Sequence, residues 1–140
     1  MANRSGTDYI VVHCTATRPS MDIGRVEVDA WHRHRGFLGI GYHYIIRRDG
    51  VVEVGRSEEA IGAHAKGYNS TSVSIALVGG VTEDDVQVAE DNFTSDQLEA
   101  LYELVTDLQK KYPDAQVLGH RDLKGVTKEC PSFDVRDWLD

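Results

Sequence analysis

Three short apolar runs, separated by stretches of helical pattern, constrain the fold of this 140-residue chain most strongly. The runs are DYIVVHC, VSIALVGG and AQVLGH, which have the length and apolar character of buried strands. The segment GYHYIIRRDGVVEVG adds a β-hairpin, because Asp49-Gly50 is a strong two-residue turn signal between apolar strands. The chain is therefore expected to contain a β-sheet.

The segment TSDQLEALYELVTDLQKKY gives the clearest helix pattern. Thr94 and Gln97 form a capping box at its start, leucines and a valine recur at helical spacing, and Pro113 ends it. RVEVDAWHRHRG predicts a second helix that stops at Gly36, and FDVRDWLD predicts a short third one. Helices mixed with strands in this way indicate an α/β layered domain.

Length and composition fit one globular domain, which we expect over residues 8–140 after a flexible N-terminal segment, residues 1–7. The formal net charge of −8 argues against a nucleic-acid binder, which needs a clustered basic face. No apolar run has the ~20 residues of a membrane span, and the first residues do not form a secretory signal. Synthesis in the cytoplasm is expected, where a disulfide between Cys14 and Cys130 is disfavoured.

Six histidines invite a metal hypothesis, although three of them have simpler explanations. His32 and His34 lie two apart on a predicted helix, so they point in different directions and are expected on a solvated face. His43 lies within a predicted strand between two tyrosines, where a hydrogen-bonded structural histidine is the default. No H-E-x-x-H motif of a helical zinc site is present.

His13 and His120 differ, because each ends an apolar strand where a loop begins. Strand alternation turns Cys14 away from His13, so Cys14 is expected as a small buried hydrophobe. Cys130 follows His120 by ten residues, across a loop that can fold back. Two imidazoles and one thiolate form a three-ligand zinc site with a fourth position for water, although spacing alone leaves chance as an alternative.

Two further residues have properties that amide hydrolysis needs. Lys128 lies two residues before Cys130, where its ammonium could stabilise an oxyanion, or it could be an ordinary exposed lysine. Tyr42 opens the strand YHYIIR, where its phenol could reach a cleft or pack in the core. The residues alone leave both alternatives open.

Five segments resemble the type 2 N-acetylmuramoyl-L-alanine amidases, a family shared with peptidoglycan recognition proteins and, within it, the small endolysins of the T-odd coliphages. They are VHCTATRPS, WHRHRGFLGIGYHYIIRRDGVVEVGR, GAHAKGYNSTSVSIALVGG, NFTSDQLEAL and CPSFDVRDWL. They cover nearly the whole chain in order. The resemblance implies a central mixed sheet flanked by helices, with a zinc cleft on one face.

The resemblance also implies roles for five residues. One zinc ion per chain would be held by His13, His120 and Cys130, and the catalytic residues would be Tyr42 and Lys128. The implied activity is hydrolysis of the amide between N-acetylmuramic acid and L-alanine in peptidoglycan, as in a phage or prophage endolysin. A receptor without catalysis is the alternative, but such relatives typically lack the cysteine ligand.

The loop GAHAKGYNS is expected to contribute to the substrate groove. His64, Lys66 and Asn69 could hydrogen-bond sugar or stem-peptide groups, or the loop could be merely mobile. We expect a monomer that reaches the cell wall after holin-type release or lysis. A family member from the T-odd coliphages also binds and inhibits its phage RNA polymerase, so the same additional role is possible in principle for this chain.

Overall fold

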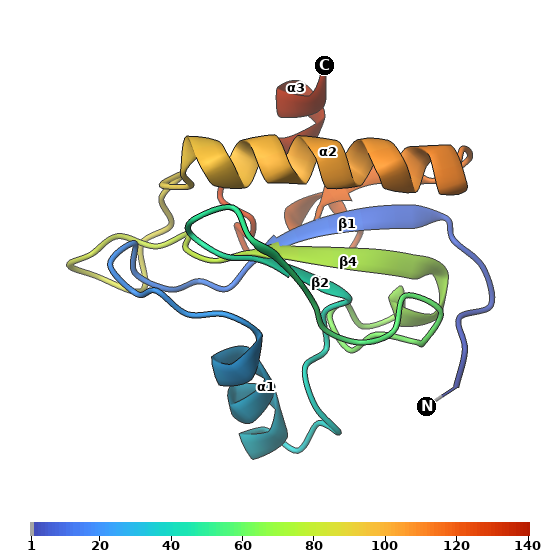
Figure 1. Cartoon of the computed structure of the whole chain (residues 1–140), viewed down its shortest axis with the longest axis horizontal. Coiled ribbons are helices and arrows are strands. Elements are labelled where there is room, and N and C mark those ends of the chain that lie inside the picture. The colour runs from blue at the N-terminus through green and yellow to red at the C-terminus, as the bar shows by residue number, and fades with distance from the viewer. Residues whose placement is uncertain (1) are drawn as a thin grey trace.

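A mixed five-stranded sheet runs through the centre of the computed structural model, which describes residues 2–140 (Figure 1). The strands are β1 (Tyr9–Cys14), β2 (Tyr44–Ile46), β3 (Val52–Val54), β4 (Ser72–Leu77) and β5 (Gln116–Gly119). Their order across the sheet is β3-β2-β4-β1-β5. The last four of these are mutually parallel and β3 is antiparallel to β2. The expected α/β domain with a mixed sheet is confirmed.

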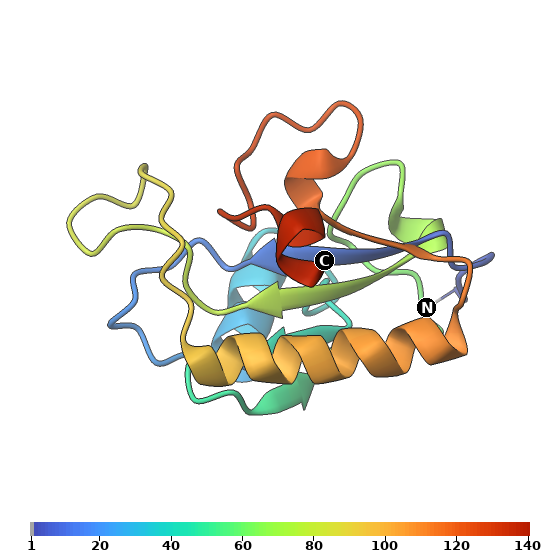
Figure 2. The same ribbon diagram turned by 90° about the horizontal axis from the view of Figure 1, so that it is seen from above.

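Helices cover both faces of this sheet. α2 (Ser95–Lys111) and α3 (Val135–Leu139) lie on one face, and α1 (Arg25–His34) lies on the other (Figure 1). Two 3₁₀ turns, η1 (Asn69–Thr71) and η2 (His120–Asp122), precede β4 and follow β5. Figure 2 shows α2 running along the sheet, with the segment that joins β5 to α3 forming a long loop that projects to one side of the sheet. The predicted helices therefore form where the sequence places them.

Alternation along β1 separates its two faces. Ile10 and Val12 are fully buried in the core beneath α2, whereas Val11 packs in a separate cluster on the opposite face. Strand alternation places the His13 side chain, which is 2% exposed, on the same face of the sheet as Val11. It places the Cys14 side chain on the same face as Val12. As predicted, the two neighbouring side chains point to opposite sides of the sheet.

The capping box at the start of α2 forms as predicted and also fastens the helix to the sheet. Thr94 Oγ1 accepts a hydrogen bond from the Gln97 backbone N–H, and Gln97 Oε1 accepts one from the Thr94 N–H. The buried Gln97 amide then donates to the carbonyls of Ile46 and Val78. The apolar face below it is buried at Leu101, Val105 and Leu108. One side chain thus fixes the helix start over the ends of β2 and β4.

The hairpin turn differs from the two-residue turn that the sequence predicts. Arg47 N–H donates to the Val51 carbonyl at 2.9 Å, which leaves three residues in the loop, and Gly50 has a φ of +87°. A three-residue loop of this kind needs a left-handed residue at its end, which glycine adopts without strain. The Asp-Gly pair located the turn correctly but not its length.

The N-terminal segment makes backbone contacts with the domain. The Arg4 N–H donates to the Glu59 carbonyl and the Ser5 N–H donates to the Ser70 carbonyl. The Arg4 side chain also donates to the Glu58 carbonyl at 2.7 Å. These bonds join residues 4 and 5 to the domain. The expected flexibility of residues 1–7 stays a prediction. Within the described residues, no helix has the length and apolarity to cross a membrane.

Candidate functional site

Strand pairing brings His13 and His120 together. β1 and β5 are parallel neighbours in which Val12 pairs with Gly119. The next residues are therefore side by side: His13, near the end of β1, and His120, the first residue of η2. The two imidazole rings lie with their centroids 4.4 Å apart. Both histidines therefore extend from carboxyl ends of parallel strands, the position from which site residues of α/β sheets commonly emerge.

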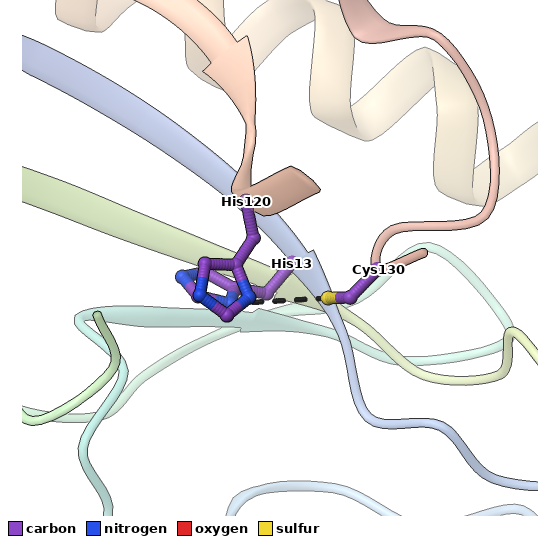
Figure 3. Close-up of side chains that lie close together, drawn as sticks. All are labelled: His13, His120 and Cys130. Carbon is purple, nitrogen blue, oxygen red and sulfur yellow. Dashed lines mark hydrogen bonds between the residues drawn. The ribbon is translucent and has the colours of Figure 1, made fainter. Parts of the chain in front are cut away.

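Cys130 completes this cluster from the loop that precedes α3. Its Sγ lies 3.9 Å from His13 Nδ1 (Figure 3), and it accepts a hydrogen bond from the Cys14 backbone N–H at 3.0 Å. One donor atom from each of His13, His120 and Cys130 lies within 4.8 Å of the other two. Both cysteines are free, and Cys14 is buried as predicted.

The donor set fits a tetrahedral metal such as zinc. Bond lengths of about 2.0–2.3 Å in a tetrahedron place donor atoms about 3.3–3.6 Å apart, close to the spacing of these side chains. Two imidazole nitrogens and one sulfur are ligands that zinc prefers, and three of them leave a fourth position for water or substrate. The neighbouring Cys14 thiol and burial raise the pKa of the Cys130 thiol well above its usual value, against the smaller opposing effect of the Cys14 backbone N–H, so the thiolate would form only when a metal binds.

Their surroundings favour the neutral form of both histidines in this cluster. Burial, with help from neighbouring positive charges, lowers the pKa of His13 well below its usual value. Burial and the charge of Lys128 lower the pKa of His120 as well. A neutral imidazole keeps one nitrogen lone pair free, which is the state that binds a metal. The same charge effect indicates that the exposed Lys128 ammonium lies near the cluster.

Tyr42 lies beside His13, with ring centroids 5.2 Å apart. It belongs to the segment that enters β2, and its other aromatic neighbour is His32, at 5.3 Å. Burial raises the pKa of the Tyr42 phenol well above its usual range, so the hydroxyl stays protonated at neutral pH. The structure thus brings a protonated phenol to the edge of the three-donor cluster.

His32 is placed differently from its expected solvated position on α1. It is 7% exposed, and its Nδ1 accepts a hydrogen bond from the Gly41 backbone N–H at 2.8 Å. That bond fixes the chain immediately before Tyr42, so His32 supports a site residue without belonging to the metal cluster. His34 is exposed as expected. His43 is the expected structural histidine, fully buried with Ser74 and the Ala60 carbonyl as partners.

The loop expected to bind substrate contributes its three residues in three different ways. Lys66 is exposed, as a substrate-binding residue would be. The Asn69 side chain accepts hydrogen bonds from the backbone N–H groups of His64 and Ala65, both at 2.9 Å, so it shapes the loop. His64 turns inward, with its Nδ1 2.8 Å from His13 Nε2. Substrate binding by these residues stays a prediction.

Comparison with known proteins places this arrangement in a family. The sequence profile of the N-acetylmuramoyl-L-alanine amidases matches residues 3–133. The chain is 48% identical to the endolysin of Klebsiella phage KP32 and 47% identical to the endolysin of Escherichia phage T7. Each match covers 96% of this chain and 87% of the relative. The similarity therefore extends over almost the whole of both proteins.

A solved structure gives the same result for the fold. The Ph2119 endolysin, from a bacteriophage of Thermus scotoductus, superposes with a TM-score of 0.79 and 30% sequence identity. The match covers 99% of this chain and 86% of that one. The chain therefore belongs to the N-acetylmuramoyl-L-alanine amidase family of hydrolases, together with these phage endolysins.

Proposed function

We propose that this chain is a zinc-dependent endolysin that hydrolyses the amide between N-acetylmuramic acid and L-alanine in bacterial peptidoglycan. The observation that carries the proposal is the convergence of His13, His120 and Cys130, with donor atoms within 4.8 Å, in a chain of this amidase family. Zinc held there would supply a Lewis acid that polarises the amide carbonyl and activates water near neutral pH.

Lys128 is assigned the stabilisation of the oxyanion that develops on the scissile carbonyl. Its exposed side chain is the positive charge felt by both histidines of the cluster. An exposed ammonium near the cluster can approach the carbonyl oxygen when substrate is bound. Positive charge aimed at an oxyanion lowers the barrier because the interaction is stronger in the transition state than in the ground state.

Tyr42 is assigned a positioning role as a hydrogen-bond donor. The phenol is next to His13, and burial raises its pKa, which makes the phenolate unavailable as a base at neutral pH. A protonated hydroxyl can still orient water or the substrate carbonyl beside the cluster. Of the two residues near the ligands, Lys128 therefore supplies charge and Tyr42 supplies orientation.

The surface beside the cluster would bind the sugar and the stem peptide. Lys66 is an exposed, positively charged side chain in the loop 62–70, and it would bind a carboxylate of the stem peptide. The net charge of −8 means that the whole protein does not attract an anionic polymer, so recognition depends on such local contacts. We propose that the enzyme acts as a monomer, on a wall reached through a holin-type pore or after lysis.

Product analysis on defined muropeptides tests the activity. Mass spectrometry should find free lactyl groups on the sugar and new L-alanine amino termini, in protein that contains about one zinc per chain. Activity should disappear with a strong chelator and return with added zinc. New reducing sugar ends in place of new amino termini would identify a glycosidase and overturn the proposal.

Inhibition of a phage RNA polymerase, which the sequence resemblance implies, stays a prediction. A transcription assay with the cognate polymerase and increasing amounts of this protein would check it. If the protein inhibits the polymerase, transcripts should disappear when the two proteins are present in equal amounts. Unchanged transcription would rule out this role.

A further inference from the structure

The two ring nitrogens of His13 face different partners. Nδ1 is directed toward Cys130, whose Sγ is 3.9 Å away, and Nε2 lies 2.8 Å from His64 Nδ1 (Figure 3 shows the Cys130 side). A neutral imidazole carries one proton, so Nδ1 can bind a metal only if the proton is on Nε2. The hydrogen bond to His64 therefore decides whether His13 is a competent ligand.

Ser72 determines which nitrogen of His64 carries a proton. Its hydroxyl lies 2.7 Å from the Tyr68 carbonyl oxygen and 3.0 Å from His64 Nε2. A carbonyl oxygen only accepts, so the single hydroxyl proton of Ser72 is donated to Tyr68. Toward His64 the Ser72 oxygen must then accept, which places the proton of His64 on Nε2.

The rest of the chain of hydrogen bonds follows from this assignment. Neutral His64 with its proton on Nε2 has a bare Nδ1, which accepts the Nε2 proton of His13. His13 Nδ1 is then left bare, and it is the nitrogen that faces Cys130. The opposite arrangement would require Ser72 to give its proton to His64. The oxygens of Ser72 and Tyr68 would then lie 2.7 Å apart with no proton between them, which is a repulsive contact.

The surrounding residues hold His64 in this orientation. Ser72 is fully buried at the start of β4, and Asn69 clamps the backbone on either side of the His64 ring by accepting from His64 and Ala65 N–H groups. Gly62 leaves the ring its space, since a Cβ at that position would lie 2.7 Å from His64 Cδ2. The imidazole cannot turn away from His13 without breaking several contacts.

We propose that His64 is a positioning residue which, together with Ser72, fixes the tautomer and the ring orientation of the metal ligand His13. The proposal rests on the zinc site of the proposed function and gives His64 a task other than contact with substrate. Partners of this kind raise metal affinity because the ligand enters the site already in its binding form.

Zinc affinity, measured by competition with a chromophoric chelator, provides the main test. His64→Leu removes the acceptor at similar volume and should weaken zinc binding by about 10–100-fold. His64→Asn can place Oδ1 near the former Nδ1, so it should recover most of that loss. Ser72→Ala frees His64 to change tautomer and should fall between the two. Equal zinc affinity in His64→Leu and the wild type would overturn the proposal.

His43→Asn serves as a matched control, because His43 is also a buried imidazole bonded to a strand serine but does not contact His13. It should leave zinc affinity unchanged in folded protein. Nitrogen-15 NMR of the wild-type apoprotein tests the assigned proton positions on His13 and His64 without any substitution. It should find His13 and His64 both protonated on Nε2, and a His13 protonated on Nδ1 would contradict the proposal.

The outcomes separate this inference from the proposed function. A wild-type protein that binds no zinc would remove the metal site itself. A wild type that binds zinc and cleaves the amide, beside a His64→Leu variant with normal zinc affinity and a raised KM, would overturn only the positioning role and assign His64 to substrate.

Discussion

The sulfur of Cys130 accepts a hydrogen bond from the backbone N–H of Cys14 at 3.0 Å. This bond ties the loop before α3 to the end of β1, and it holds the Cys130 sulfur 3.9 Å from His13 Nδ1. The thiols of Cys14 and Cys130 also lie within hydrogen-bonding reach of each other. Only Cys130 belongs to the three-donor cluster, so we expect substitutions at the two cysteines to have different effects on a bound metal.

Cys130→Ser should abolish stoichiometric zinc binding, since a neutral hydroxyl is a much weaker zinc ligand than a thiolate. We expect zinc content to fall from about one per chain to near zero, measured by atomic emission on dialysed protein. Cys14→Ala is the matched control and should keep its zinc. Zinc retained in Cys130→Ser, or lost in Cys14→Ala, would contradict the assignment.

Lys128→Ala should keep zinc and lose turnover. The expected loss in kcat is about 10²–10³-fold, the size seen when one oxyanion-stabilising group is removed. Lys124→Ala, an exposed lysine of the same loop, provides the control and should keep normal kcat. Steady-state rates on a soluble muropeptide check both variants. Turnover in Lys128→Ala equal to that of the control would remove Lys128 from the mechanism.

Tyr42→Phe removes one hydroxyl and keeps the ring beside His13. We expect normal zinc content and a fall in kcat of about tenfold or more. Because burial raises the pKa of this phenol, its ionisation should not appear in the rate profile between about pH 6 and 9. The variant should therefore keep the wild-type profile shape. A lost ascending limb would show that Tyr42 acts as a base.

Glu58 should make stability depend on pH in the acid range. Burial alone would raise its pKa, but hydrogen bonds from Lys111, Tyr112 and Tyr44 hold the pKa at about 2, against 4.5 for an unperturbed group. A depressed folded-state pKa gives stability that is complete above about pH 4.5 and is lost as the pH falls toward 2. Glu58 thus joins the end of α2 to β2 most firmly at neutral pH.

Glu58→Gln should lower the free energy of unfolding at pH 7 by about 1 kcal/mol and flatten its decline between pH 4.5 and 2. Urea unfolding at several pH values measures both effects. Glu99→Gln, at an exposed position of α2, should leave the decline as it is in the wild type. Parallel curves for Glu58→Gln and the wild type would contradict the role given to this carboxylate.

Local patterns in the sequence predict most of the fold. The capping box of Thr94 and Gln97, the apolar runs and strand alternation at His13 are all short-range signals, and each forms as expected. The position of His13 and His120 at strand ends brings them together once the sheet pairs. The resemblance then selects Cys130 from the loop, where spacing alone leaves several arrangements open.

What the sequence could not predict depends on contacts between distant segments. His32 has the pattern of a surface position on α1, and only the fold of the following loop brings the Gly41 N–H onto its ring. The inward turn of His64 likewise depends on Ser72 and His13, which lie eight and 51 residues away in the chain. No local pattern encodes such partners, so supporting residues of the site are harder to find than its ligands.

The pairing of Val12 with Gly119 has a consequence for when the enzyme can become active. A slip of one residue in β5 would turn His120 to the opposite face of the sheet and away from His13. Metal binding by the proposed site therefore requires the correct register between β1 and β5. Two of the three proposed ligands, His120 and Cys130, also follow β5 in the chain. During synthesis the site cannot assemble until β5 has docked and Cys130 has left the ribosome. A metal site built this way can form only after all five strands of the sheet have been synthesised.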